Sequence, residues 1–220
     1  MEGYCCAIQE EEINTHGLKQ RRCEDKENEI HQLKCRICHK EKESIQHVLA
    51  CCPRLRIPMY LPTRHNAVAK RIYHLITGHR ANDIQDVFND DEVEVWWDVK
   101  IPTKTSVEHN KPDLVVWKKQ EKRAYIVDVV VGLDVNVEKN ENIKRDYYYP
   151  LSTELKRLYP DYTFDIIPIS IGATGAITTS LEENITKIVN KNVRVENAIV
   201  QCQKAALFGS MKIVKSVMNK

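Results

Sequence analysis

The chain has 220 residues, of which 42% are hydrophobic and 29% charged, and its 33 Lys and Arg residues nearly balance 31 Asp and Glu residues. This hydrophobic content can fill a core, which argues against wholesale disorder. No apolar run approaches the ~18–20 residues of a membrane span, and the first residues lack the basic and apolar regions of a secretory signal. We therefore expect an intracellular chain, with one domain and an appendage or with two small domains.

Charge is segregated along the chain. Residues 44–82 contain no Asp or Glu but six Lys and Arg residues, whereas residues 83–98 contain seven acids and no Lys or Arg. The basic stretch is suited to neutralising phosphates. The alternative is an ordinary solvated face.

The first predicted elements are helical. Residues 1–34 are polar and are expected to form a loose amphipathic helix or a partly disordered lead-in. A helix is predicted from Thr63 to His79, where apolar residues repeat at helical spacing. These residues are Val68, Ile72, Leu75 and Ile76. Pro62 precedes this helix, and Gly78 offers a left-handed stop at its end.

Strand signals follow. The predicted strands are residues 92–96, which alternate polar and apolar, residues 113–117 and 124–131, which are apolar on both faces, and residues 163–171. Helices are predicted at 138–159, where Pro150 should kink or divide the helix, and at 180–190 and 196–218. This order predicts an α/β fold, with a mixed sheet flanked by helices.

Three cysteines and one histidine occur at short spacing ahead of the strands, as Cys35-x2-Cys38-x8-His47-x4-Cys52. These are the ligand types of a tetrahedral Zn²⁺ site. Cys51 competes as the fourth ligand; Cys52 is preferred because Pro53 ends the predicted helical turn there. The alternative is a group of thiols without metal. A closed four-ligand site has no open position for water, so its role would be to fold residues 35–56.

Two acidic residues lie on the predicted buried strands. If the hairpin loop is symmetric, its centre lies between Gln120 and Glu121. Asp113 then faces Asp128, with Cβ atoms roughly 4.5–5.5 Å apart. Two facing carboxylates favour a cation between them, and their oxygens suit Mg²⁺ or Mn²⁺. The alternative is that Asp113 is a turn residue after Pro112 and Asp128 a paired buried acid, since one inserted residue would separate them.

Such a site predicts phosphodiester hydrolysis, because a metal held by carboxylates polarises a phosphoryl oxygen and activates water. A nearby lysine would stabilise the developing charge. The next predicted helix carries Lys139, Lys144 and Arg145, of which Lys144 is preferred, with Lys139 as the alternative. Asp134 and Glu138 either support the metal or cap this helix.

Lys111-Pro112-Asp113, followed after fourteen residues by Asp128, resembles the Pro-Asp…Asp/Glu-x-Lys nuclease signature. It is accompanied by the Cys/His cluster and by the segments Arg64-His65-Asn66, Trp97-Asp98-Val99-Lys100-Ile101-Pro102 and Ile169-Ser170-Ile171-Gly172-Ala173. Together these motifs resemble the C-terminal region of non-LTR (LINE-type) retrotransposon polyproteins that carry a restriction-like endonuclease. The resemblance extends from Cys35 to about Phe208. It implies a restriction-endonuclease-like domain at 57–220 behind a zinc knuckle at 35–56, and a nuclear location.

The resemblance also implies roles for single residues. Asp113 and Asp128 match the family's metal-binding acids, and Lys144 matches a lysine on the following helix. Val130 stands where the signature has its lysine, so that lysine is displaced onto the helix. Tyr147 stands where a second lysine is expected. The four cluster residues match the family's zinc ligands.

The segment Arg64-His65-Asn66 lies at the start of a predicted helix within the basic stretch. We expect it to contact phosphate at the positive helix end, together with Lys70 and Arg71. The alternative is helix capping and an ordinary surface. Trp96 and Trp97 are expected to pack in the core rather than to stack on bases.

The leading hypothesis is therefore a DNA endonuclease that uses Mg²⁺ or Mn²⁺ for catalysis and Zn²⁺ for structure. One alternative is a degraded relic that only binds nucleic acid, DNA or RNA. Another is a zinc-stabilised protein–protein adaptor. No membrane partner is expected; the target sequence and the oligomeric state are left open.

Overall fold

The computed structural model describes residues 2–10, 12, 13, 15, 18, 34–78 and 84–219. Its centre is a sheet in the order β1-β2-β3-β4-β5, formed by Val87–Asn89, Val93–Trp97, Leu114–Lys118, Arg123–Gly132 and Thr163–Gly172. The pairs β1–β2, β2–β3 and β3–β4 are antiparallel, and β4–β5 is parallel. The predicted mixed sheet is confirmed, with β1 as a short strand that the sequence analysis missed.

The hairpin of β3 and β4 has the predicted register. Lys118 pairs with Arg123 and Leu114 with Val127, so the loop between the strands is symmetric. Continued by one residue, this register places Asp113 level with Asp128 at the end of the ladder.

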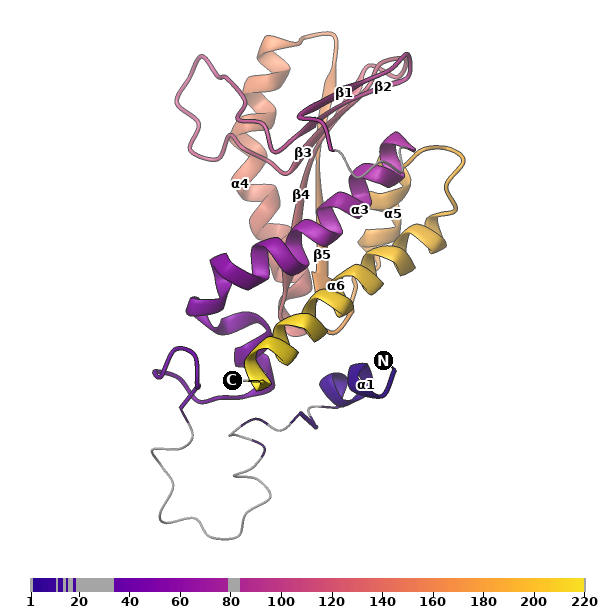
Figure 1. Ribbon diagram of the computed structural model, residues 1–220. Helices are drawn as coiled ribbons and strands as arrows, with labels where there is room; N and C mark the ends of the chain where they lie inside the picture. The colour runs from indigo at the N-terminus through magenta and orange to yellow at the C-terminus, as the bar shows by residue number, and fades with distance from the viewer. Residues whose placement is uncertain are drawn as a thin grey trace.

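Helices cover both faces of the sheet (Figure 1). Helix α4 (Val137–Leu158) lies on one face, and α3 (Asn66–Thr77), α5 (Ser180–Ile188) and α6 (Val195–Met218) lie on the other. Leu151 of α4 packs in one core with Val115 and Ile126, while Ile185 of α5 packs in the other with Val127. The two central strands are apolar on both faces because both faces are covered.

The predicted helix boundaries need two corrections. The helix predicted from Thr63 begins earlier, because η4 (Arg56–His65), wound as a π-helix, leads directly into α3 and contains Pro62. Gly78 ends α3 with a φ of 70°, as predicted; His79 lies outside the described residues. Pro150 does not divide α4. Pro150 has no N–H to donate to the carbonyl of Asp146, four residues earlier. Both residues are exposed, so water can donate to that carbonyl instead.

The N-terminal part lies against the end of α6 that carries the C-terminus. Helix α1 (Glu2–Gln9) begins it, and the short helices η2 (His47–Cys51) and η3 (Pro53–Leu55) precede η4. Much of the 1–34 lead-in lies outside the described residues. Cys35 and Cys52 share one buried core with Met211 and Val214 of α6. Among the described residues, no helix has the length and apolar character needed to cross a membrane.

Candidate functional site

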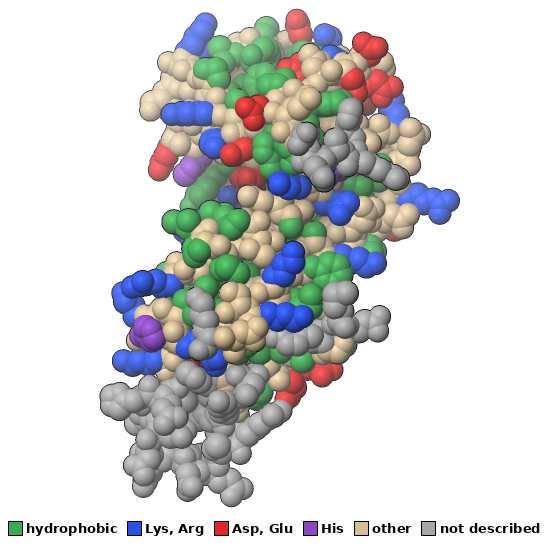
Figure 2. Space-filling view, viewed as in Figure 1, with side chains coloured by type: hydrophobic (Ala, Val, Ile, Leu, Met, Phe, Trp, Pro, Cys, Tyr) green, Lys and Arg blue, Asp and Glu red, His purple; other side chains and the backbone are tan. Residues whose placement is uncertain are grey.

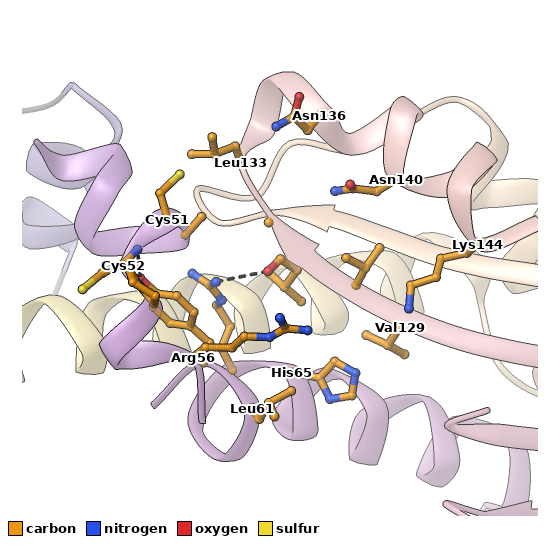
Figure 3. A pocket seen from close by; sticks show the side chains of 17 residues that line it. Cys51, Cys52, Arg56, Leu61, His65, Val129, Leu133, Asn136, Asn140 and Lys144 are labelled. Carbon is orange, nitrogen blue, oxygen red and sulfur yellow. Dashed lines mark hydrogen bonds between the residues drawn. The ribbon is translucent and has the colours of Figure 1, made fainter. Parts of the chain in front are cut away.

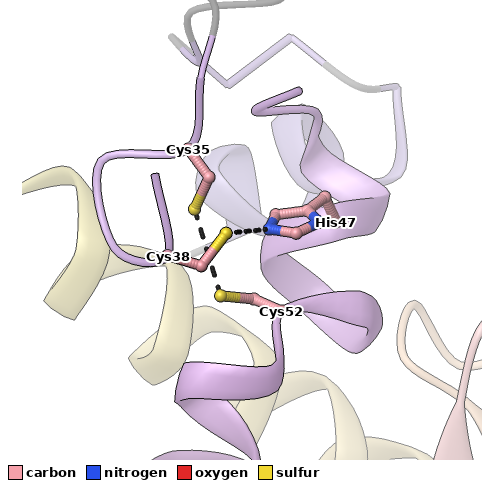
Figure 4. Close-up of side chains that lie close together, drawn as sticks. All are labelled: Cys35, Cys38, His47 and Cys52. Carbon is pink, nitrogen blue, oxygen red and sulfur yellow. Dashed lines mark hydrogen bonds between the residues drawn. The ribbon is translucent and has the colours of Figure 1, made fainter. Parts of the chain in front are cut away.

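Cys35, Cys38, His47 and Cys52 form one buried cluster (Figure 4), and their ligand atoms all lie within 4.8 Å of one another. The Sγ atoms of Cys35 and Cys52 are 4.0 Å apart, and Cys38 Sγ lies 3.4 Å from His47 Nε2. Two sulfurs bound tetrahedrally to one Zn²⁺ at about 2.3 Å would be about 3.8 Å apart. The spacing therefore fits a structural zinc and is far too long for a disulfide. Cys51 is exposed and outside the cluster, so Cys52 is the fourth member.

A tight loop brings the first two cysteines together. The N–H of Cys35 donates to the carbonyl of Glu41 at 2.7 Å, and His39 turns the chain with a φ of 57°. Arg36 closes the loop through its guanidinium, which lies 2.7 Å from the fully buried carboxylate of Glu43. These local contacts hold both thiols on one side of the loop.

The pKa values of three cluster residues are shifted, in the direction that favours metal binding for Cys38 and His47 and in the opposite direction for Cys52. Burial opposes ionisation of Cys38, but the backbone N–H groups of Glu41 and Lys40 lower the pKa of this thiol overall. Burial lowers the pKa of His47, which favours the neutral imidazole that binds metal. Burial raises the pKa of Cys52 to about 12, so its thiolate needs a positive partner. A zinc ion would supply that charge.

Asp113 lies where β3 begins and is held from two sides. Its Oδ2 accepts the backbone N–H of Val129 at 2.6 Å and lies 3.2 Å from Nε2 of His65. Burial alone would lower the pKa of His65, but the hydrogen bond and charge of Asp113, with help from Asn66 and Asp128, raise it to about 9. His65 is therefore a cation at neutral pH and orients the Asp113 carboxylate.

Asp128 lies on β4 with only 4% of its surface exposed. Its Oδ1 accepts the hydroxyl of Tyr148 at 2.6 Å, and Lys144 Nζ lies 2.7 Å from its Oδ2. The Lys144 ammonium is therefore the partner of this buried oxygen and balances the charge of the carboxylate. Burial and the charge of Asp113 raise the pKa of Asp128, against the opposing effects of Lys144 and Tyr148.

The two acids therefore interact electrostatically at the point where the β3–β4 ladder ends. Lys144 and His65 are the cationic side chains that contact these two acids. Among the described residues, only the Cys/His cluster brings three or more ligating groups together.

A cleft of about 550 Å³ (Figure 3) is lined by His65 and Lys144, which contact these acids, and by Val129, which follows Asp128 in the chain. It begins near Cys51 and Arg56, passes Leu133, and reaches His65 and Lys144, the two side chains that contact the acids. None of the described residues that line it is Asp or Glu. The cleft therefore presents positive charge and amides toward any ligand, with the carboxylates behind them.

Arg64 does not offer the free donors expected of a phosphate contact. It is only 1% exposed, and its guanidinium donates to the carbonyls of Leu49 and Val131 and to Ser210 Oγ at 2.7–3.1 Å. Gly209 permits this position, because a Cβ there would lie 2.8 Å from the Arg64 Cα. Arg64 ties η2, β4 and α6 together around the cleft.

The prediction that residues 64–66 lie at the positive N-terminal end of a helix is wrong. His65 and Asn66 join η4 to α3 within one helical stretch, and the N–H of Asn66 bonds to the carbonyl of Leu61. No helix therefore begins at this segment. Lys70 and Arg71 are exposed on α3.

The surface charge follows the segregation in the sequence. On the face shown in Figure 2, most Asp and Glu side chains gather at the end of the molecule that carries β1 and β2, and Lys and Arg side chains spread over the rest. Lys70 and Arg71 therefore lie in a part of the chain poor in acids.

Other expected residues have different positions. Lys144 is the lysine that contacts Asp128, whereas Lys139 is exposed. Asp134 accepts donors from Thr174 and Ala176 and so fixes the turn after β5. Trp96 and Trp97 contact other rings, those of Trp117 and Tyr73.

Sequence reasoning missed Tyr148 and the cleft-lining amides Asn136 and Asn140. A signal for Tyr148 was present, because it follows Lys144 by four residues and so shares its helix face.

Comparison of the chain with protein-family models and with curated proteins finds no match.

Proposed function

We propose that the protein is a DNA endonuclease of retrotransposon origin that depends on Mg²⁺ or Mn²⁺ and holds a structural zinc. The observation that carries this proposal is the buried carboxylate of Asp128, which lies 2.7 Å from Lys144 and which the β3–β4 register, continued by one residue, places level with Asp113. Two neighbouring acids and a lysine are the groups that metal-assisted phosphodiester cleavage requires.

Asp113 and Asp128 would hold the divalent ion. Asp128 is buried and its cationic partner is Lys144, which the divalent ion would join. The raised pKa of Asp128, caused by burial and by Asp113, indicates that two negative charges here are costly without an added positive one. When bound, Mg²⁺ or Mn²⁺ would polarise a phosphoryl oxygen and lower the pKa of a water molecule.

His65, Tyr148 and Lys144 would orient the two acids and balance their charge. His65 keeps a proton on Nε2 and orients the Asp113 carboxylate. Tyr148 donates its hydroxyl to Asp128 Oδ1 and so fixes the other acid. Lys144 lines the cleft and, with its side chain a quarter exposed, is able to meet a phosphate. Its ammonium would stabilise the charge that develops on phosphorus.

The cleft supports nucleic acid as the substrate. It is lined by Arg56, His65 and Lys144 but by no acid among the described residues, and this favours a polyanion. Lys70 and Arg71 on α3 would contact the phosphate backbone away from the reaction. The zinc at the Cys/His cluster would hold residues 35–56 against α6. It would also fix one wall of the cleft, because Cys51, next to the ligand Cys52, lines the cleft.

Nicking of supercoiled plasmid by the full chain in Mg²⁺ or Mn²⁺ tests this proposal. We expect nicking by the wild type but none by Asp113→Ala/Asp128→Ala. The control variant Asp161→Ala, which removes an exposed acid, should nick as the wild type does. Cleavage that survives in the double variant, or its absence in the wild type with both metals, would contradict the proposal.

The second candidate is a nucleic-acid-binding protein without cleavage. Tyr147, which stands where the resemblance leads us to expect a second lysine, is the observation that favours it. In that case the protein would bind DNA with a strong dependence on salt, and neither metal would produce nicked plasmid.

A further inference from the structure

Two aromatic rings stack on each other, one of them on the helix that also carries Asn140 and Lys144 of the cleft, and the proposed cleavage does not use them. The rings of His109 and Tyr147 have centroids 4.3 Å apart and are inclined by only 12°. Tyr147 is 47% exposed, although a ring of this size is usually more buried. His109 is half-buried, so the exposed Tyr147 ring is the member of the pair on which a planar ligand would stack.

The position of the pair connects it to the reacting groups. Tyr147 follows Asn140 and Lys144 at the spacing i, i+4, i+7, so it continues the stripe of α4 that lines the cleft. It lies one helical turn, roughly 5 Å, beyond Lys144 along the helix axis. The neighbouring Tyr148 contacts Asp128 directly.

The other ring is held in place by its loop. His109 belongs to the segment between β2 and β3, which lies beside α4 (Figure 1). Ile101 and Asn110 bond to each other at the base of this loop, and the hydroxyl oxygen of Tyr148, whose proton goes to Asp128, lies 3.3 Å from the carbonyl oxygen of Lys111. The loop is therefore fixed on both sides of His109, and the stacked pair is preorganised.

The charges around the pair favour a base over a phosphate. Glu108 and Asp146 adjoin the two rings in the sequence and are both exposed. Their negative charge would repel a phosphate, whereas the π-face of a nucleobase carries no net charge. The positive cleft and the rings therefore suit different parts of a nucleotide.

We infer that the His109–Tyr147 pair is a stacking site for an unpaired nucleobase next to the phosphate that lies at Lys144. The inference rests on the proposed function, because it requires a nucleic acid in the cleft. It deepens that function by predicting a preference for frayed or single-stranded DNA at the reaction centre, since a paired base cannot place its face on a protein ring.

Binding of a single-stranded DNA oligonucleotide that contains 2-aminopurine tests the inference in Ca²⁺, by fluorescence quenching and by affinity. We expect Tyr147→Ala to weaken binding roughly 5- to 100-fold, the effect of losing one stacked base, and to remove the quenching. Tyr147→Phe should retain both within about twofold, because the ring alone stacks. Tyr149→Ala, which removes a more exposed tyrosine of α4, is the matched control and should bind as the wild type does.

The possible results separate the two proposals. Wild-type binding with unchanged affinity and quenching in Tyr147→Ala would overturn the stacking site and leave the nuclease proposal intact. Binding without metal-dependent nicking would contradict the nuclease and leave the stacking site supported. A wild type that binds no oligonucleotide at physiological salt would overturn both.

Discussion

Lys144 Nζ lies 2.7 Å from Asp128 Oδ2, and the lysine side chain is 25% exposed whereas that of Asp128 is only 6% exposed. The lysine therefore neutralises a buried acid while it remains at the edge of a cleft large enough for a ligand. This relationship makes Lys144 both a structural partner of Asp128 and the candidate for charge stabilisation during cleavage.

Replacing Lys144 with alanine is expected to reduce plasmid nicking by about 10²–10³-fold, the usual effect of losing one charge-stabilising donor. It also leaves the Asp128 charge buried without its cation. The free energy of unfolding should fall by about 1–3 kcal/mol, less than for a fully buried pair because the lysine is partly exposed. Lys139→Ala, which changes an exposed lysine of the same helix, should alter neither quantity. Equal nicking by the two variants would remove Lys144 from the mechanism.

The two adjacent cysteines provide a matched pair for the zinc site. Cys52→Ser is expected to lose stoichiometric zinc, because it removes one of four clustered ligands. Its Tm should fall by roughly 10 °C, which corresponds to several kcal/mol in a chain of this size. Cys51→Ser, at an exposed position, should keep its zinc and its Tm. Metal content by mass spectrometry decides the question: loss of zinc from Cys51→Ser with retention in Cys52→Ser would reverse the assignment.

Local patterns predicted the parts of the fold that depend on local sequence. The register of β3 and β4 followed from the symmetry of one short loop, so the level positions of Asp113 and Asp128 were accessible before the structure. The four-ligand spacing likewise identified the Cys/His cluster. Strand β1 was missed because three residues carry too little periodicity.

Arg64 shows what sequence patterns could not supply. Its partner Ser210 is 146 residues away, and its burial depends on Gly209 in the final helix. An arginine in a basic stretch gives no local sign of such a partner. The start of the helix was also misplaced, because Pro62 normally marks a helix start but here lies inside the π-helical stretch.

Gly209 should be intolerant of even one added methyl group. A Cβ there would lie 2.7 Å from the Arg64 Cβ and 2.8 Å from its Cα, and backbone cannot move aside as a flexible side chain can. We expect Gly209→Ala to lower the free energy of urea unfolding by about 1–3 kcal/mol through overpacking. Gly3→Ala is the control, since nothing lies within 4 Å of its added Cβ. It should be neutral or more stable by up to about 1 kcal/mol. Equal effects would show that α6 and η4 are not closely packed.

Lys70 and Arg71 are expected to contribute to DNA affinity through phosphate contacts alone. Neutralising both to glutamine should weaken binding to all sequences alike. It should also reduce the slope of log K against log salt concentration by up to about 1.8, or 0.9 for each lost contact. Lys156→Gln/Lys191→Gln removes the same charge from exposed positions elsewhere and should leave the slope unchanged. A slope that stays constant in the α3 variant would mean that DNA does not lie along this helix.

Glu154 should make the loop between β2 and β3 sensitive to acid. Its carboxylate lies 2.7 Å from Arg157 Nη2 and accepts the N–H groups of Lys104 and Thr105. The Arg157 hydrogen bond is the largest influence on this carboxyl and, despite burial, the pKa of Glu154 is lowered to about 2 from its usual 4.5. A lowered pKa gives stability that is complete above the unfolded value and is lost as pH falls from about 4.5 toward 2.

We expect Glu154→Gln to be less stable than the wild type at neutral pH, with the difference shrinking between pH 4.5 and 2 and vanishing below. Thermal unfolding of both proteins across this range measures the difference, and protonation of the zinc ligands cancels because both proteins share it. The loop also carries His109, so the variant should bind single-stranded DNA more weakly at neutral pH, whereas Glu138→Gln on the exposed face of α4 should not. A stability difference that stays constant through the acid range would show that the Glu154 charge does not hold this loop on α4.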